Sequence, residues 1–272
     1  MDYITGSHGF LGTHLLQALK GREITPIPHT KIKTTKLKLF DNFFFLSAYG
    51  NMYPHKNDKK IIQANVSDLI KIVLQVDGQP FNSFVYMSTS SVKLPKQTMY
   101  SRTKRASEEI LLSFAEKYHK PFCIIRPYSI TGVGEQKEHL IPTLIRSCLE
   151  EEQVNFVPDP VHDFIDVDDV AAGIVNLSSH HARGIFELGS GRKHTNRQVL
   201  EIVEAVTGKK ANINIVGQLR LYDNEDWVSS NFRARSYGWL PQKTLEQSIV
   251  EQVEAYKKWI KNLLVPLKSW GV

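Results

Sequence analysis

The stretch Thr5-Gly6-Ser7-His8-Gly9-Phe10-Leu11-Gly12 lies between an apolar segment, Met1–Thr5, and a segment with helical periodicity, Phe10–Lys20. Glycines in the spacing G-x-x-G-x-x-G let the backbone turn tightly and approach an anion without a Cβ clash. The free N–H groups at the start of the following helix face that anion. We therefore expect a strand, a phosphate-binding turn and a helix, with every residue from Gly6 to Gly12 close to a ligand diphosphate.

The first half of the chain alternates short apolar runs with helical periods, and this alternation predicts an α/β, doubly wound parallel sheet with helices on both faces. The expected strands are Met1–Thr5, Ile24–Ile27, Asn42–Ser47, Phe84–Met87 and Phe122–Arg126, and the expected helices are Phe10–Lys20, Lys60–Val76 and Tyr100–His119.

The second half is mixed, which predicts a smaller C-terminal lobe that binds substrate. Its expected helices are Leu140–Glu150, Asp166–Ser178, Thr195–Thr207 and Leu245–Lys261, and its expected strands are Ile185–Leu188 and Ile213–Val216. We assign residues 1–160 mainly to the sheet domain and residues 161–272 mainly to the smaller lobe, from which some elements return to the sheet.

Composition narrows the function further. The chain of 272 residues has a net charge of +6 and a pI of about 9.1. Its lysine clusters lack interleaved aromatic residues, so we expect an anionic small ligand and no nucleic acid. The chain shows no signal peptide and no apolar run of bilayer length, which predicts no membrane association. Cys123 and Cys148 fit core positions in a reducing, cytoplasmic compartment, and the histidines show no metal spacing.

Tyr100 and Lys104 form a Y-x-x-x-K motif on a predicted helix. Residues four apart share one helical face, and a nearby ammonium lowers the pKa of a phenol, so this tyrosine can exchange a proton near neutral pH. The preceding strand ends in small hydroxyl residues, Ser88–Ser91, which alone are typical of a strand-to-loop transition. Together with the motif that follows, they indicate a catalytic cluster.

The TGxxGFxG loop resembles the fingerprint of the extended short-chain dehydrogenase/reductase family, and the resemblance continues along most of the chain. This family includes nucleotide-sugar epimerases, dehydratases and reductases. The resemblance implies a Rossmann-like fold, an NAD(P) cofactor and a nucleotide-sugar substrate. It implies that Thr89 is the hydroxyl partner of Tyr100, and that Lys104 holds the cofactor ribose. It leaves the oligomeric state, monomer or homodimer, open.

The remaining expected site residues also follow from the resemblance. Cofactor contacts are implied for Ser47 and Ala48 after the third strand, for Asn65 in the second helix and for Pro127 in Arg126-Pro127. Substrate contacts are implied for Ser129, His162 and Arg220. Ser129 stands where the family commonly has asparagine, and His162 stands where it has the arginine of R-D-F. Arg220-Leu221-Tyr222-Asp223 matches R-x-G-D apart from the glycine, and that arginine grips the substrate diphosphate in many members.

The function implied is that of an NAD(P)-dependent, epimerase-like oxidoreductase that transfers a hydride at a sugar carbon, C4 by resemblance. An NADP-dependent reductase of a 4-keto sugar and a non-catalytic NAD(P)-binding regulatory protein are the alternatives. Ser90 and Ser91 stand where 4,6-dehydratases and sugar-acid decarboxylases carry acidic residues. Neither reaction is therefore expected, because a serine cannot act as a carboxylate base at neutral pH.

The end of the second strand favours NADP over NAD. Folds that prefer NAD usually place an acidic residue there for the ribose 2′-hydroxyl. Here no carboxylate occurs between Glu23 and Asp41, and the strand is followed by His29 and Lys31. Cations at this point would attract a 2′-phosphate.

Overall fold

The computed structural model describes residues 1–52, 57–76, 78–217 and 227–264. Its centre is a six-stranded sheet in the order β10-β5-β4-β3-β1-β2, and every pairing in it is parallel. The strands are β1 (Asp2–Thr5), β2 (Ile24–Ile27), β3 (Asn42–Phe45), β4 (Ser83–Met87), β5 (Phe122–Pro127) and β10 (Gly184–Leu188). The chain reverses its direction of progress across the sheet between β1 and β3, the place where ligands bind in open α/β sheets.

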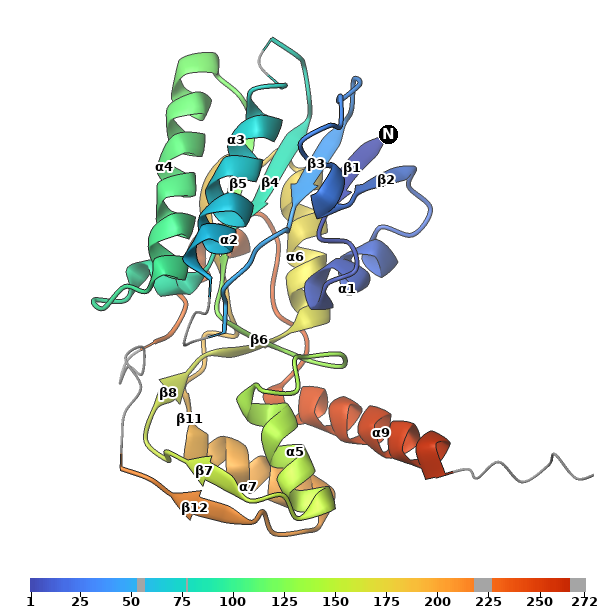
Figure 1. Cartoon of the computed structure of the whole chain (residues 1–272), viewed down its shortest axis with the longest axis vertical. Coiled ribbons are helices and arrows are strands. Elements are labelled where there is room, and N and C mark those ends of the chain that lie inside the picture. The colour runs from blue at the N-terminus through green and yellow to red at the C-terminus, as the bar shows by residue number, and fades with distance from the viewer. Residues whose placement is uncertain (53–56, 77, 218–226, 265–272) are drawn as a thin grey trace, which may run out of the picture.

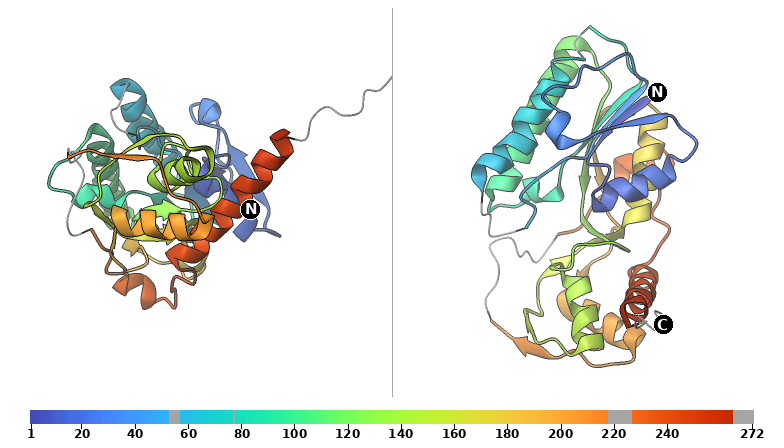
Figure 2. Two further views of the ribbon diagram at one scale, coloured as in Figure 1. Left: turned by 90° about the horizontal axis from the view of Figure 1, so that it is seen from below. Right: turned by 45° about the vertical axis from the view of Figure 1, so that its right-hand side comes forward.

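Helices cover both faces of this sheet, as Figures 1 and 2 show. On one face lie α1 (Phe10–Ala18) and α6 (Val167–Ser179), which pack against each other. The other face carries α4 (Met99–Tyr118) and an interrupted helix made of α2 (Asp58–Ile62), the π-helical turn η2 (Gln63–Ser67) and α3 (Asp68–Val73). The predicted doubly wound fold is confirmed.

Strand β3 shows why the sheet is stable. All four of its residues are buried, as expected for a parallel strand covered on both sides. Successive side chains alternate between faces, so Phe44 joins the apolar cluster beneath α1 and α6, whereas Phe43 and Phe45 join the cluster beneath α3 and α4. Each such ring contributes about 2 kcal/mol of burial free energy.

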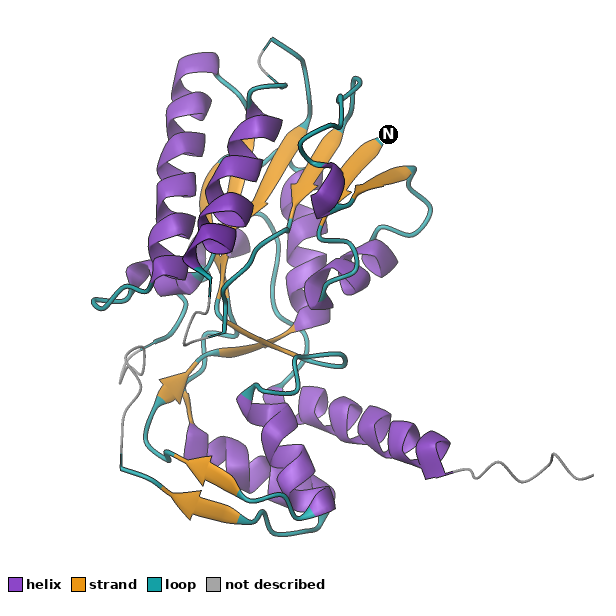
Figure 3. Cartoon of the chain, viewed as in Figure 1, coloured by secondary structure: helices purple, strands orange, loops and turns teal. Residues whose placement is uncertain are grey.

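The smaller lobe has its own apolar core, formed by side chains of α5 (Leu140–Glu150), β7 (Val154–Phe156), α7 (Asn196–Thr207) and α9 (Leu245–Leu264). Strand β12 (Ile213–Ile215) pairs with β7 in parallel. Figure 3 shows these elements below the main sheet. Because α5 precedes residue 160 and α6 and β10 follow it, the chain crosses between the lobes more than once.

The remaining elements are short. Strand β6 (Ser129–Thr131) pairs in parallel with β9 (Phe164–Asp166), and β8 (Val161–His162) pairs antiparallel with β11 (His194–Thr195). Helix α8 (Phe232–Arg235) and the 3-10 turns η1 (His29–Lys31) and η3 (Ser90–Lys93) complete the described chain. The sequence analysis did not predict these elements.

Candidate active site

The glycine loop joins β1 to α1 in a conformation that requires glycine. Gly6 has a φ of +72°, in the left-handed region. A Cβ at Gly12 would lie 2.1 Å from the carbonyl oxygen of Gly6, so no other residue fits there. Gly9 is the N-cap of α1 and offers no side chain to the first amides of the helix. These N–H groups are therefore available to an anion, and the cradle fits a dinucleotide diphosphate.

The other residues of the loop differ in exposure. Ser7 is buried, and its hydroxyl lies 3.1 Å from Nδ1 of His8, which is exposed. Phe10 and Leu11 are half-buried. The loop therefore offers mainly backbone atoms to a ligand, and His8 is the loop residue whose side chain is exposed.

The segment after β3 passes directly beside this loop. The backbone N–H of Ser47 donates to the hydroxyl of Thr5 at 3.2 Å, and a Cβ at Gly6 would lie 2.9 Å from the same nitrogen. Ala48, the next residue, is exposed. The ends of β1 and β3 therefore form one continuous surface at the point where the chain changes direction.

Asn65 is fully buried in η2, and its side chain is used within the protein. Its Oδ1 accepts a hydrogen bond from the backbone N–H of Tyr49, and its Nδ2 donates to the carbonyl of Tyr49 and to the hydroxyl of Thr103, each at 3.0 Å. Asn65 therefore holds the segment after β3 against α4. The structure thus gives Asn65 a role in linking two parts of the chain, and the cofactor contact that the resemblance implied stays a prediction.

Thr89, Tyr100 and Lys104 gather at the carboxyl end of β4. Thr89 follows this strand, and its hydroxyl accepts a hydrogen bond from the N–H of Ser91 at 3.2 Å, which caps η3. Tyr100 is in the first turn of α4, and Lys104 lies one turn further on the same face. The buried ammonium of Lys104 donates to the carbonyl of Met87. The topology thus brings the three predicted catalytic residues to one strand end.

Burial dominates the ionisation of this cluster. It raises the pKa of the half-buried Tyr100 to about 12. Burial also lowers the pKa of Lys104 to about 7, against the opposing effect of the Glu108 carboxylate. The sequence analysis expected the ammonium to lower the pKa of the tyrosine. In the cofactor-free chain the pKa of Tyr100 is shifted upwards instead, because burial removes the phenolate from water.

A buried ion pair supports the cluster from below. Glu108, one turn after Lys104, is almost fully buried and accepts hydrogen bonds from Nε of Arg126 at 2.9 Å and from its NH2 group at 2.5 Å. The hydroxyl of Ser88 donates to the same carboxylate. This network ties α4 to the ends of β4 and β5. Sequence reasoning missed it, because Glu108 and Arg126 belong to different elements and no local spacing relates them.

The residues expected to decide the cofactor type lie at the edge of the sheet. His29 and Lys31 form part of η1, which follows β2 directly, and both side chains are exposed. Pro127 is buried at the end of β5, the strand next to the edge strand β10. The cofactor-binding residues predicted from the sequence therefore extend along the carboxyl edge from β2 to β5.

Residues 55–189 match the family model described as the NAD dependent epimerase/dehydratase family. The chain is a member of this family. It is 26% identical over 225 residues to a UDP-glucose 4-epimerase of Corynebacterium glutamicum, which covers 71% of this chain and 68% of that relative. It is 22% identical to a GDP-6-deoxy-D-mannose reductase of Pseudomonas aeruginosa, with 91% of this chain and 94% of the relative covered.

A solved structure of similar shape supports the same fold. The UDP-N-acetylglucosamine 4-epimerase from Methanobrevibacter ruminantium, in complex with UDP-N-acetylmuramic acid, superposes with a TM-score of 0.87. The two sequences are 18% identical, and the comparison covers 95% of this chain and 98% of that one.

In this member of the epimerase/dehydratase family, two of the predicted substrate residues, Ser129 and His162, lie in the short strands β6 and β8. The N–H of Ser129 donates to the carbonyl of Asp163 at 2.9 Å, which joins β6 to β9. His162, in β8, is half-buried, and its ring centroid lies 5.8 Å from that of Trp227. Arg220 lies outside the described residues.

Asp163, which follows His162, has a structural role that the sequence analysis did not predict. Its buried carboxylate accepts hydrogen bonds from the N–H groups of Ser190, Gly191 and Ser229 at 2.7 to 3.1 Å, and from the hydroxyls of both serines. It thereby fixes the loop after β10 to the segment that begins at Trp227. The motif His162-Asp163-Phe164 therefore contains a carboxylate that links two segments of the chain, in addition to the predicted substrate residue His162.

The described part of the chain was also searched for a metal site, a membrane-spanning helix and surface depressions. No group of three His, Cys, Asp or Glu side chains there is arranged to hold a metal ion. Among the described helices, none combines the length and apolarity needed to cross a membrane. Two surface depressions, one beside Cys148 and one beside His119, lie away from the carboxyl edge of the sheet and its catalytic cluster.

Proposed function

We propose that this chain is an enzyme that transfers a hydride at C4 of a nucleotide-bound sugar, with a nicotinamide dinucleotide as cofactor. The observation that carries the proposal is the convergence of Thr89, Tyr100 and Lys104 at the end of β4, two strands from the glycine loop at the end of β1. This placement lets one extended ligand contact both groups, since the carboxyl ends of parallel strands lie along one edge.

The residues of the glycine loop fit the cofactor. The missing side chains at Gly6 and Gly12 let the turn close tightly against its own backbone and against the segment after β3, and the uncapped start of α1 offers N–H donors to a diphosphate. Lys104 would hold the ribose. When bound, the nicotinamide accepts or supplies the hydride.

Tyr100 would move the proton. Because the pKa of its phenol is about 12, Tyr100 is in the proton-donating form in the free chain at neutral pH. It can therefore protonate a sugar ketone oxygen as that oxygen becomes a hydroxyl, and it accepts the proton in the reverse direction. Thr89 would orient the reacting oxygen with its hydroxyl, which already lies among donors at the strand end.

Substitution of the tyrosine tests this role. Tyr100→Phe removes only the hydroxyl, so folding and cofactor affinity should stay near those of the unmodified protein, while turnover falls by roughly 10² or more. Tyr118→Phe, at the far end of the same helix, is the matched control and should keep full turnover. Near-normal turnover by Tyr100→Phe would contradict the assignment of Tyr100 as the group that moves the proton. An unmodified protein that binds the cofactor but turns over no sugar nucleotide would support the non-catalytic alternative.

A second candidate is an NADP-dependent reductase of a nucleotide 4-keto sugar. The observation that favours it is the exposed pair His29 and Lys31 after β2, with no carboxylate in the segment that follows until Asp41. A cation there stabilises a 2′-phosphate and does not stabilise a free 2′-hydroxyl to the same degree.

Calorimetric titration separates the two candidates. If the basic turn binds a 2′-phosphate, Lys31→Glu should raise the Kd for NADPH roughly tenfold and change the Kd for NADH by less than about twofold. Lys209→Glu, on the smaller lobe, is a charge-matched control. Equal or tighter binding of NADH by the unmodified protein would refute the NADP preference. Stoichiometric oxidation of NADPH by a 4-keto sugar identifies a reductase, because an epimerase regenerates its cofactor in each cycle.

A further inference from the structure

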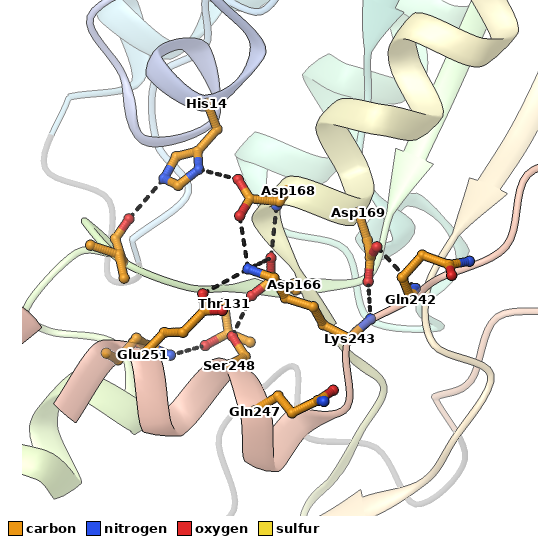
Figure 4. A network of polar contacts seen from close by, with 12 residues as sticks. His14, Thr131, Asp166, Asp168, Asp169, Gln242, Lys243, Gln247, Ser248 and Glu251 are labelled. Carbon is orange, nitrogen blue, oxygen red and sulfur yellow. Dashed lines mark hydrogen bonds and ion pairs between the residues drawn. The ribbon is translucent and has the colours of Figure 1, made fainter. Parts of the chain in front are cut away.

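A polar network joins the two lobes behind the glycine loop (Figure 4). It consists of His14 on α1, Asp166 and Asp168 at the start of α6, and Lys243 and Glu251, which come from the turn before α9 and from α9 itself. None of these residues belongs to the proposed catalytic cluster. The network lies where the first turns of α1 meet the smaller lobe.

His14 is held between two hydrogen-bond acceptors. Its Nδ1 lies 2.5 Å from Oδ1 of Asp168, and its Nε2 lies 2.9 Å from the carbonyl oxygen of Val133. A carboxylate and a carbonyl can only accept, so both ring nitrogens must carry a proton to bond them. A neutral imidazole has a single N–H, whereas the imidazolium has two. The geometry is therefore that of a charged His14.

The surrounding charges favour this form. Carboxylates from three elements face the network, that of Asp166 at the end of β9, those of Asp168 and Asp169 on α6, and that of Glu251 on α9. Lys243 is the one permanent cation among the residues drawn. Burial acts to raise the pKa of Asp168, but hydrogen bonds from Lys243 and His14 hold it below its usual range. A proton on His14 reduces the excess of negative charge.

The contact with Val133 fixes a segment that covers the start of α1. Residues 132–139 follow β6, and Gly134 lies against the ring of Phe10, the first residue of α1. From the other side, Gln252 of α9 donates to the hydroxyl of Thr131 at 2.8 Å. Within the segment, the carboxylate of Glu135 is occupied by the hydroxyl of Thr131 and the ring of His139. His14 is therefore the polar contact of this segment with α1.

We propose that His14 is a positioning residue that acts as an imidazolium, fastening residues 132–139 and the start of α6 to α1 beside the glycine loop. Loss of one ring proton leaves a nitrogen lone pair facing an acceptor, so one of the two contacts breaks. Because Asp168 is charged, the Nδ1 proton stays and the contact with Val133 is lost.

The protonation state can be measured without any substitution. Nitrogen-15 spectra of the histidine rings in the full, cofactor-free chain distinguish an imidazolium from either neutral tautomer, and the His14→Gln spectrum assigns the signal. Protons on both ring nitrogens of His14 at pH 7 are expected. A neutral ring at that pH would overturn the proposal.

Hydrogen exchange tests the positioning role. Residues 132–139 should be protected from exchange in the unmodified chain, after correction for intrinsic exchange. His14→Gln, which cannot donate to both acceptors in this geometry, should lower protection of the segment about tenfold at every pH. His180→Gln is the control, because His180 is exposed at the end of α6. A segment that remains protected in His14→Gln would refute the role. The measurement uses no cofactor or substrate, so its failure is separate from any failure of the proposed function.

Discussion

Lys104 places an amine where the cofactor-free fold cannot solvate it, and its removal should stabilise the protein. The side chain is 1% exposed, its ammonium donates to the carbonyl of Met87, and its Nζ lies 4.3 Å from the centroid of the Tyr86 ring. These contacts do not offset burial, which lowers the pKa from 10.5 to about 7. We therefore predict that Lys104→Met is more stable than the unmodified chain, although it is inactive.

The magnitude follows from the change in pKa. A difference of this size corresponds to about 4 kcal/mol of unfavourable free energy near pH 7, at 1.36 kcal/mol for each unit. Methionine fills most of the same volume, but it leaves the Met87 carbonyl without this donor, which costs about 1 kcal/mol. The net gain is on the order of 3 kcal/mol, or a rise in Tm of about 6 °C for a chain of this size.

The gain in stability of Lys104→Met over the unmodified chain should decrease as the pH rises. Folding lowers the pKa of Lys104, so the unfolded chain binds more protons between about pH 7 and 10.5. The stability of the unmodified protein therefore rises with pH across this window, and that of Lys104→Met lacks this contribution. The difference between the two proteins is largest at pH 7 and below, and it shrinks towards pH 10.5.

Urea unfolding of the cofactor-free proteins at about pH 6, 7.5 and 9 measures this difference. Arg102→Met, an exposed position on the same helix, serves as the control and should change stability by less than about 0.5 kcal/mol. A Lys104→Met protein that is less stable than the unmodified chain at pH 7, or a gain that does not vary with pH, would contradict the reasoning. The expected outcome is a site whose function is kept at the expense of stability.

Three further predictions concern the glycine loop, the ion pair and the reaction. Gly12→Ala should abolish cofactor binding and destabilise the chain by about 1–3 kcal/mol, measured by calorimetry and urea unfolding, because its Cβ would meet a backbone oxygen at 2.1 Å; tight binding by this variant would disprove the cradle. Glu108→Leu should lower the free energy of unfolding by about 3–5 kcal/mol, because it leaves the partly buried Arg126 unpaired. A decrease below about 1 kcal/mol in urea unfolding would show that the ion pair is dispensable for stability. Because Ser90 and Ser91 supply no carboxylate, chromatography of the products should find no 4-keto-6-deoxy sugar and no carbon dioxide release; either product would refute this exclusion.

The local pattern of the sequence determined the fold and pointed to the proposed catalytic group. The loop from Gly6 to Gly12 could be interpreted because its glycines, the strand before it and the helix after it are adjacent in the chain. Tyr100 and Lys104 could be proposed because an i, i+4 pair on a helix is a local relation. Alternation of apolar runs with helical periods sufficed for the parallel sheet, since it reflects burial on two faces.

The tertiary structure decided what surrounds these groups and how they ionise. The brackets made by Asn65 and Asp163 and the pair between Glu108 and Arg126 join segments that are distant in sequence. The contact between His14 and Asp168 spans 154 positions. No periodicity marks such contacts, because each depends on how whole elements pack. The pKa of Lys104 depends on them too: a lysine is the same residue on any helix, and only the depth at which α4 buries it decides whether its charge is retained at neutral pH.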